Sequence, residues 1–412
     1  MKRKKFTPLT AVSVSAVLLA AALTGCSPPG DDDDGDGDSS GPIVIGASVP
    51  LSGPLAGFGS FLQWGYQHAV DEVNDAGGIE IDGEKRKVEL KMVDDKTDPN
   101  QVTTNIKTLI SSDDSVALLG SCTPDLVNPG ALVADSEKIP FVTGCNPLEV
   151  FTSVKDWTYA WDIFFSIPEL ASLSFQTMAE LGLETNKKVA ILHDNGPDGK
   201  AVGEEIWPAI AEQAGFEVVA NVEFPSDNTD FSAAVQEAKD SGAEVLLVDA
   251  ITPQSISLRK QMAAVGWTPK IMVSEKGAEP VQYAEALGDL ADGVMVGAYW
   301  DPSFPYEGSA ELQEAWESDN PDQSSSQHIA DSYTAAMVLM DAIAAAGSTD
   351  AEEINDAIGE TNKEYPVGPV QFADDNTAKI AVANSQWQDG KPVIVFPVDR
   401  ATGEVLFPLP GS

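Results

Sequence analysis

An alternation of strand-like and helix-like segments recurs through most of the chain and restricts the fold more than any other feature. Short apolar runs rich in β-branched residues are each followed by a loop containing Gly, Pro or Ser and then by a helical pattern. Strands are expected at residues 43–49, 88–93, 116–119 and 139–142, and again at 189–192, 216–222, 243–248, 271–273 and 294–300. Repeated units of this kind predict an α/β fold with mostly parallel sheets.

The length of the chain and its breaks in pattern predict two lobes. A chain of 412 residues is too long for one hydrophobic core of ordinary size. An aromatic segment at 157–165 separates the two sets of units, and further breaks fall at 301–305 and 361–372. We expect two doubly wound lobes joined by three crossovers at these breaks. The expected bounds are 42–161 plus 302–366 for lobe 1, and 162–301 plus 367–412 for lobe 2. Asp389-Gly390 predicts a hairpin between the last two strands.

The first 41 residues are not expected to belong to either lobe. Residues 1–26 combine a basic head with a short apolar run, as in a secretory signal peptide. The run ends at Leu23-Thr24-Gly25-Cys26, which resembles a lipobox, so Cys26 is the expected site of lipidation. Residues 27–41 are rich in Asp, Gly, Pro and Ser and predict a disordered acidic linker. We therefore expect an exported protein held by lipid at the extracytoplasmic face of the cell membrane.

The charge of the chain excludes some partners. With 65 acidic and 24 basic residues the formal net charge is −41, which disfavours nucleic acid and anionic lipid surfaces. An EF-hand reading of the Asp run fails because its twelfth position falls on Ile43 instead of Glu. We expect no metal and no cofactor.

Two cysteines remain if Cys26 is lipidated. Cys122 and Cys145 follow two strands that are expected to be neighbours. A disulfide, two buried thiols and a metal site are the three alternatives, and we favour the disulfide because an exported protein meets oxidising conditions. No His or further Cys falls at ligand spacing nearby in sequence, which places the metal site last.

The loop after the first strand is the first candidate wall of a binding site, since ligands bind beyond the carboxyl ends of parallel strands. Phe58 lies between Gly57 and Gly59, before a helix expected to open at Ser60, and either contacts a ligand or caps the core. Trp161 and Trp300 are expected near crossovers, where packing is the simpler role.

The sequence offers little support for catalysis. GxSxG, HExxH and P-loop motifs are missing, and a thiol nucleophile at Cys122 or Cys145 with His193 is the least unfavourable catalytic arrangement. We therefore expect a protein that is not an enzyme.

Several segments from residue 41 onward match one family in order and spacing. They are Gly46-Ala47-Ser48-Val49-Pro50-Leu51-Ser52-Gly53-Pro54, Gly57-Phe58-Gly59, Asn74-Asp75-Ala76-Gly77-Gly78-Ile79, Asp94-Asp95 with Asp98-Pro99, Ile139-Pro140-Phe141-Val142-Thr143, and His193-Asp194 with Asp198-Gly199. The chain resembles the type I periplasmic binding proteins, and within them the leucine/isoleucine/valine-binding receptors of ABC importers. The resemblance implies two lobes that close on a small solute, with ABC permease subunits as partners.

The resemblance also implies ligand contacts. An aromatic residue matching Phe58 packs on the ligand, and small polar residues after the third and fourth strands hold a carboxylate. Here those loops offer Ser121, Cys122, Thr123, Thr143, Cys145 and Asn146. In the second lobe Glu275 matches the acidic residue that pairs with an α-ammonium group, and Asp198 and Thr252 occupy neighbouring contact positions.

Departures from the family pattern occur at these same positions. The loop at 143–147 is shorter by about two residues, Cys145 replaces a Thr, and Asp198 replaces a Tyr. Glu275 and Asp198 also have simpler readings, as an exposed loop carboxylate and as a helix cap. We expect a receptor for an amino-acid-like or other polar organic solute; the alternatives are an extracellular sensor for a signalling partner and, third, a thiol-dependent enzyme.

Overall fold

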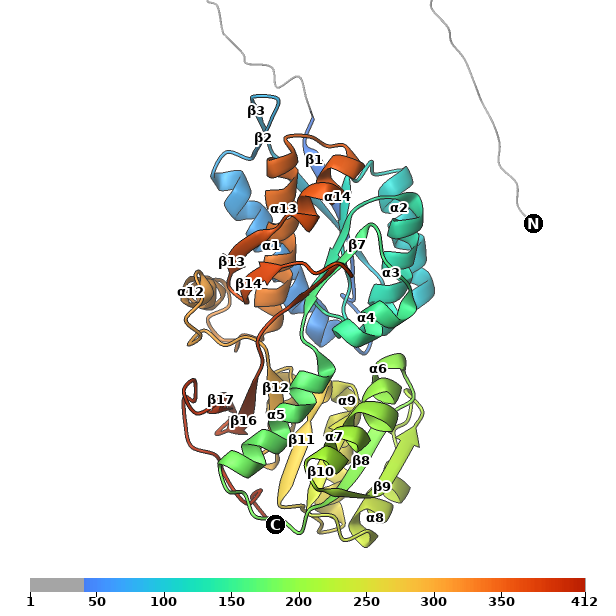
Figure 1. The fold of residues 1–412 in the computed structure, drawn as a ribbon, viewed down its shortest axis with the longest axis vertical. Helices are drawn as coiled ribbons and strands as arrows, with labels where there is room; N and C mark the ends of the chain where they lie inside the picture. Colours follow the sequence, from blue (N-terminus) through green and yellow to red (C-terminus); the bar gives the residue numbers. More distant parts are fainter. Residues whose placement is uncertain (1–40, 412) are drawn as a thin grey trace, which may run out of the picture. The chain divides into compact units, whose positions relative to one another are not determined.

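The computed structural model describes residues 41–411 and contains two large sheets (Figure 1). The expected signal peptide, Cys26 and nearly all of the expected linker lie outside the described residues. The six-stranded sheet has the order β15-β7-β6-β5-β1-β4, and the seven-stranded sheet has the order β17-β16-β12-β11-β10-β8-β9. We use lobe 1 for the elements around the six-stranded sheet and lobe 2 for those around the seven-stranded sheet. The α/β two-lobe fold class is confirmed.

Every neighbouring pair in the lobe 1 sheet is parallel. Its strands are β1 (Ile43–Val49), β4 (Val88–Asp94), β5 (Ala117–Leu119), β6 (Phe141–Thr143), β7 (Ala160–Phe164) and β15 (Thr377–Lys379). Its helices are α1 (Ala56–Asp75), α2 (Pro99–Ser111), α3 (Pro124–Glu137), α4 (Leu148–Val154), α12 (Ser309–Asp319), α13 (His328–Ala346) and α14 (Ala351–Gly359). Two small hairpins accompany them, β2 (Ile79–Ile81) with β3 (Glu84–Arg86), and β13 (Asn362–Tyr365) with β14 (Gly368–Gln371).

The lobe 2 sheet is parallel except for its last two strands. Its strands are β8 (Lys188–Asp194), β9 (Glu217–Phe224), β10 (Val245–Asp249), β11 (Ile271–Ser274), β12 (Met295–Ala298), β16 (Ala383–Gln388) and β17 (Lys391–Phe396). Its helical segments are α5 (Ile167–Glu180), α6 (Pro197–Lys200), the π-helix η1 (Ala201–Ile206), α7 (Trp207–Gln213), α8 (Ser232–Asp240), α9 (Thr252–Ala264), α10 (Glu275–Ala278), α11 (Gln282–Leu287) and the 3₁₀ turn η2 (Gly288–Leu290). The expected β16–β17 hairpin is confirmed, because Asp389 and Gly390 both have positive φ, as a tight type I′ turn requires.

Two of the expected lobe boundaries are wrong. The boundary between residues 161 and 162 cuts through β7, all of whose residues are buried within the lobe 1 sheet. A strand buried on both faces need not alternate polar and apolar residues. The aromatic residues of this segment were therefore interpreted as a crossover between the lobes. The boundary between residues 366 and 367 is also misplaced, because β14 pairs with β13 and β15 pairs with β7 in lobe 1. The chain crosses between Phe164 and α5, and again between Lys379 and β16; the boundary at 301/302 falls between β12 and α12.

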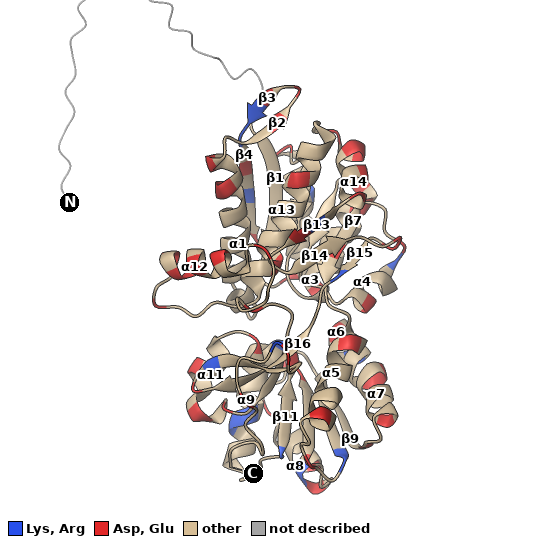
Figure 2. Ribbon diagram, turned by 60° about the vertical axis from the view of Figure 1, so that its left-hand side comes forward, with Lys and Arg blue, Asp and Glu red and all other residues tan. Residues whose placement is uncertain are grey.

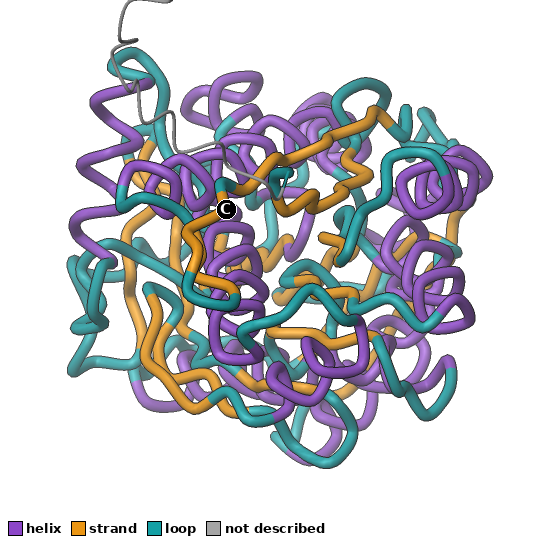
Figure 3. The backbone as a smooth tube through the Cα atoms, turned by 90° about the horizontal axis from the view of Figure 1, so that it is seen from above, coloured by secondary structure: helices purple, strands orange, loops and turns teal. Residues whose placement is uncertain are grey.

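Acidic side chains occur on helices of both lobes, whereas the apolar helix α13 is mostly buried. Figure 2 shows Asp and Glu on helices of both lobes, including α7, α12 and α14, while Figure 3 shows the strands flanked by helices. Among the described residues α13 is long and apolar enough to cross a membrane, but 72% of its most apolar window is buried inside the protein. It packs along α1 as a core helix of lobe 1, which places His328 at its first residue.

Candidate functional site

A cavity lies where the carboxyl ends of strands from both sheets face each other. Its volume is about 60 Å³. Part of its lining comes from the ends of β1, β5, β6, β8, β10 and β11 and the segments that follow them, and the rest from β7, α5, β12 and the start of α13. Six residues expected from the sequence line it: Phe58, Cys122, Thr123, Cys145, Asp198 and Glu275. The position agrees with the general rule for ligands in parallel α/β sheets.

Phe58 reaches the cavity from a helix instead of a loop tip. Helix α1 begins at Ala56, four residues before the expected start at Ser60, so Phe58 lies in its first turn. A Cβ atom at Gly59 would lie 2.0 Å from the Pro50 carbonyl oxygen, so a glycine at this position lets the helix start pack directly on the preceding loop. The Phe58 ring is 2% exposed and contacts the His328 ring edge-on at a centroid distance of 4.9 Å.

Four expected contact residues do not line this cavity. Ser121 Oγ donates to Asp95 Oδ2 at 2.7 Å, and Asn146 Nδ2 donates to Asn128 Oδ1 at 2.8 Å. Thr143 is fully buried beside Gly120, and Thr252 is buried at the start of α9. The hydroxyl and amide groups expected to hold a solute carboxylate are therefore directed into lobe 1 or covered.

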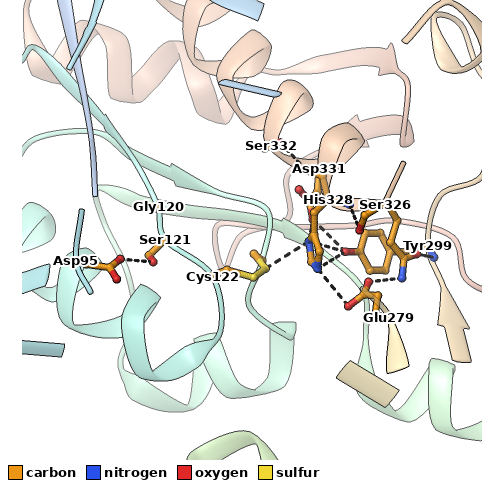
Figure 4. Close-up of a disulfide and its surroundings, with 12 residues drawn as sticks. Asp95, Gly120, Ser121, Cys122, Glu279, Tyr299, Ser326, His328, Asp331 and Ser332 are labelled. Carbon is orange, nitrogen blue, oxygen red and sulfur yellow. Dashed lines mark hydrogen bonds and ion pairs between the residues drawn. A yellow bond between two sulfur atoms is a disulfide. The ribbon is translucent and has the colours of Figure 1, made fainter. Parts of the chain in front are cut away.

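A disulfide occupies the lobe 1 wall instead. Cys122 and Cys145 are bonded to each other with a Cα–Cα distance of 4.9 Å, and both line the cavity. The structure adds a residue that sequence spacing missed, because His328 Nδ1 lies 3.6 Å from Cys145 Sγ. Figure 4 shows His328 beside the disulfide. The three side chains could in principle group around a metal ion, but sulfurs bonded to each other are not thiolate ligands.

His328 is the centre of a buried polar cluster that joins the two lobes. Its Nδ1 lies 2.6 Å from Asp331 Oδ2 within α13, and its Nε2 lies 3.1 Å from Glu279 Oε2, which follows α10 in lobe 2. The Tyr299 hydroxyl donates to Asp331 Oδ2 at 3.1 Å and lies beside the same ring (Figure 4). Burial alone would lower the pKa of His328, but Glu279 and Asp331 outweigh it and raise that pKa to about 10. The imidazolium is therefore charged and paired on both ring nitrogens.

Lys276 forms a second charged cluster, entirely within lobe 2. Its Nζ lies 2.6 Å from Asp249, 3.0 Å from Asp198 and 3.2 Å from Asp194, residues at the ends of β10 and β8 and in α6. Burial would lower the pKa of Lys276, yet the three carboxylates raise it well above its usual value. Asp198 therefore pairs with Lys276, and its expected alternative as a helix cap is not seen, since Gly196 occupies the cap. Lys276 was not predicted from the sequence. The available signal was that this lysine follows one strand closely, while neighbouring strands end in aspartates.

Glu275 is the least satisfied carboxylate of the cavity. Its Oε2 accepts a hydrogen bond from the Gly297 backbone N–H at 3.3 Å, while its Oε1 is buried and has no hydrogen-bond partner within the described part of the chain. Burial raises the pKa of Glu275 to about 7; the Gly297 N–H opposes this rise, and Glu279 and Asp198 add to it. An unpartnered buried carboxylate oxygen is costly unless a cation completes it.

The two crossover tryptophans do not line the cavity. Trp161 Nε1 donates to Asn355 Oδ1 at 2.8 Å, and Trp300 Nε1 donates to Ser309 Oγ at 3.1 Å. Both side chains are buried, so their role here is packing.

A two-lobed α/β protein with a small cavity at facing strand ends belongs to the class of proteins that enclose a ligand between lobes. Comparisons with known proteins make the assignment specific. The family described as "Periplasmic binding protein" matches residues 42–391. The chain belongs to this family of solute-binding proteins.

Individual relatives agree with this assignment. Leu/Ile/Val-binding protein homolog 7 of Brucella melitensis is 25% identical over 95% of this chain and 98% of its own length. The leucine-binding protein LivK of Thermotoga maritima superposes with a TM-score of 0.76 at 21% identity, covering 86% of this chain and 97% of its own. The branched-chain amino-acid transporter protein LivJ of Streptococcus pneumoniae, solved with isoleucine, also has a TM-score of 0.76 at 22% identity, covering 86% of this chain and 100% of its own. These structures establish the fold that the sequence pattern predicted.

Proposed function

We propose that this protein is the extracytoplasmic receptor of an ABC importer and encloses a small, polar organic solute between its lobes. One observation carries the proposal. The cavity combines lobe 1 residues such as Phe58 and Cys122 with lobe 2 residues such as Glu275 and Lys276, and its charged groups are buried or half-buried. Buried charges with an unpartnered oxygen are expected where a ligand completes the hydrogen bonding.

Lobe closure is the proposed mechanism. A solute that contacts both walls binds the closed form better than an open one and shifts the equilibrium toward closure. The contact between His328 of lobe 1 and Glu279 of lobe 2 can form only when the lobes approach, so it supports the closed form. The solute would then displace water from between Phe58 and the lobe 2 carboxylates.

The remaining parts of the proposal concern location and partners. Lipidation at Cys26 would tether the receptor to the membrane, with residues 27–41 as an extended acidic spacer. The partners would be the solute and ABC permease subunits, with no part for nucleic acid. A ligand-sensing domain that reports to a signalling partner uses the same closure and is the second candidate. We propose no catalytic role, since a disulfide between Cys122 and Cys145 removes the thiol nucleophile.

A thermal-shift screen tests the binding function. Amino acids, amides, amines and aromatic acids are added to the purified mature protein, and a ligand raises the melting temperature by mass action. A concentration-dependent rise with at least one compound supports the receptor. Stabilisation by none of these classes contradicts it, and uptake of a stabilising solute by cells with and without the gene separates import from sensing.

A further inference from the structure

The lobe 1 wall offers little to a carboxylate group. Ser121, Thr143 and Asn146 do not line the cavity, and the disulfide that does line it has no N–H or O–H donor. Of the polar side chains expected to hold a carboxylate from lobe 1, only the Thr123 hydroxyl lines the cavity. The nearby N-terminus of α3 carries Asp125 in its first turn, so a carboxylate already lies where an anion would need the helix dipole. Burial raises the pKa of Asp125; Lys276 of lobe 2 opposes this rise, and Asp194 and Asp198 of lobe 2 add to it.

The charged residues of the cavity offer no uncommitted cation either. Lys276 and His328 are the cationic side chains among the described residues that line the cavity, against Asp198, Asp249, Glu275 and Glu279. Lys276 already contacts three carboxylates, and His328 contacts two. A ligand carboxylate would have to displace one of these short contacts and enter a cavity with an excess of negative charge.

A ligand cation meets the opposite situation. Glu275 Oε1 is buried and unpartnered, and a donor from a ligand ammonium group would complete it. The other oxygen of Glu275 accepts from the Gly297 backbone N–H, so the ammonium would share Glu275 with one backbone N–H.

Aromatic rings supply the second element of cation recognition. Phe164, Phe165 and Tyr299 line the cavity and contact one another at centroid distances of 4.3, 4.8 and 5.6 Å. The face of an aromatic ring attracts an organic cation and repels a carboxylate. Carboxylates combined with clustered aromatic rings therefore favour an ammonium ion that carries an apolar substituent.

From these contacts we propose that the solute is an organic ammonium cation without a carboxylate group, held by Glu275 and by the rings of Phe164, Phe165 and Tyr299. The proposal rests on the receptor function and narrows its solute from amino acids to amines. An amino acid carries an ammonium group and a carboxylate group, whereas the proposed solute carries only the ammonium group.

Matched ligand pairs test this selectivity by isothermal titration calorimetry on the purified mature protein. The pairs are 3-methylbutylamine with leucine and 2-phenylethylamine with phenylalanine, which differ only by the carboxylate; benzoate and tetramethylammonium complete the panel. We expect at least one amine or tetramethylammonium to bind about tenfold or more tightly than every carboxylate-bearing compound. An amino acid or benzoate that binds as tightly as the best cation overturns the ammonium proposal and leaves the receptor function intact. Binding of no compound in this panel or in the thermal-shift screen overturns both.

Glu275→Gln tests the proposed anchor without changing the size of the side chain. The affinity for the best primary amine should fall about tenfold or more, while the matched change Glu285→Gln at an exposed position of α11 should leave it unchanged. Affinity in the unmodified protein should also rise between about pH 6 and about pH 8, because Glu275 must be ionised while Lys276 and His328 stay charged throughout. Unchanged affinity in Glu275→Gln removes Glu275 from the site and overturns the proposal.

Discussion

Replacing Lys276 by Met should destabilise the protein strongly, because it leaves Asp194, Asp198 and Asp249 facing one another without a cation. The Lys276 side chain is 16% exposed, and the three carboxylates are between 3% and 10% exposed, so water screens the cluster poorly. Removing one partner of a buried ion pair typically costs about 3–5 kcal/mol of unfolding free energy. We expect a loss in this range for Lys276→Met at pH 7.

An exposed ion pair of similar length supplies the control. Lys379 Nζ lies 2.8 Å from Glu169 Oε2, with the two side chains 58% and 42% exposed. Lys379→Met should therefore cost only about 0–1 kcal/mol. The comparison isolates burial, since both substitutions replace a paired lysine by the same apolar side chain.

Urea denaturation of both variants between about pH 4 and about pH 8 measures the effect. Burial and the neighbouring Asp198 raise the pKa of Asp249 in the folded state, and Lys276→Met removes the cation that opposes this rise. Protonation of Asp249 should then relieve the repulsion, so the deficit of Lys276→Met should shrink toward pH 4. A Lys276→Met variant within about 0.5 kcal/mol of Lys379→Met at pH 7 would refute the reasoning that the cluster is buried and coupled.

Three other perturbations have expected outcomes. Cys145→Ser or full reduction opens a loop with a sequence separation of 23 residues and should cost about 3 kcal/mol, measured by melting with and without reductant; an unchanged melting temperature would show that the disulfide does not form. The pKa of His328 is raised to about 10, so its stabilising effect is fully present below about pH 6.5 and is lost as pH rises through 10; His328→Gln should flatten the pH dependence of unfolding in this window, and equal slopes would contradict the pairing. Gly59→Ala should cost about 1–3 kcal/mol because its Cβ would lie 2.0 Å from the Pro50 oxygen, whereas the Gly57→Ala control, whose nearest contact is 3.5 Å, should be close to neutral; similar melting temperatures would place the α1 start elsewhere.

The sheet architecture was predictable from the sequence because period and order carry it. The run from Ile43 to Val49 and its following loop are β-branched and apolar, then rich in Gly and Pro, and the same pattern recurs in both lobes. The segments that failed lack such a signal. Strand β7 is buried on both faces, and β15 has three residues, Thr377-Ala378-Lys379, without an apolar pattern. Their place in the sheet depends on pairing partners distant in sequence.

The site was predictable only in part for a related reason. Phe58, Asp198 and Glu275 were predicted from their positions after strand ends and from the family resemblance, and all three line the cavity. His328 was missed because it opens a helix nearly two hundred residues after Cys145, which it contacts only through the folding of the lobes. Ser121 and Thr143 have side-chain chemistry suited to a carboxylate, but burial directs them away from the cavity, and the sequence alone contains no such information.

The disulfide on the lobe 1 wall has a mechanical consequence. It joins the loop after β5 to the loop after β6, so these two loops cannot adjust independently to the shape of a solute. Adjustment is left to the opposing surface, where Glu275, Lys276 and Glu279 lie on the short helix α10 and the loop after it. A receptor built in this way would change its solute in evolution by substitutions within residues 275–279. The wall with Cys122 and Cys145 would keep its shape, so a new solute would have to fit it.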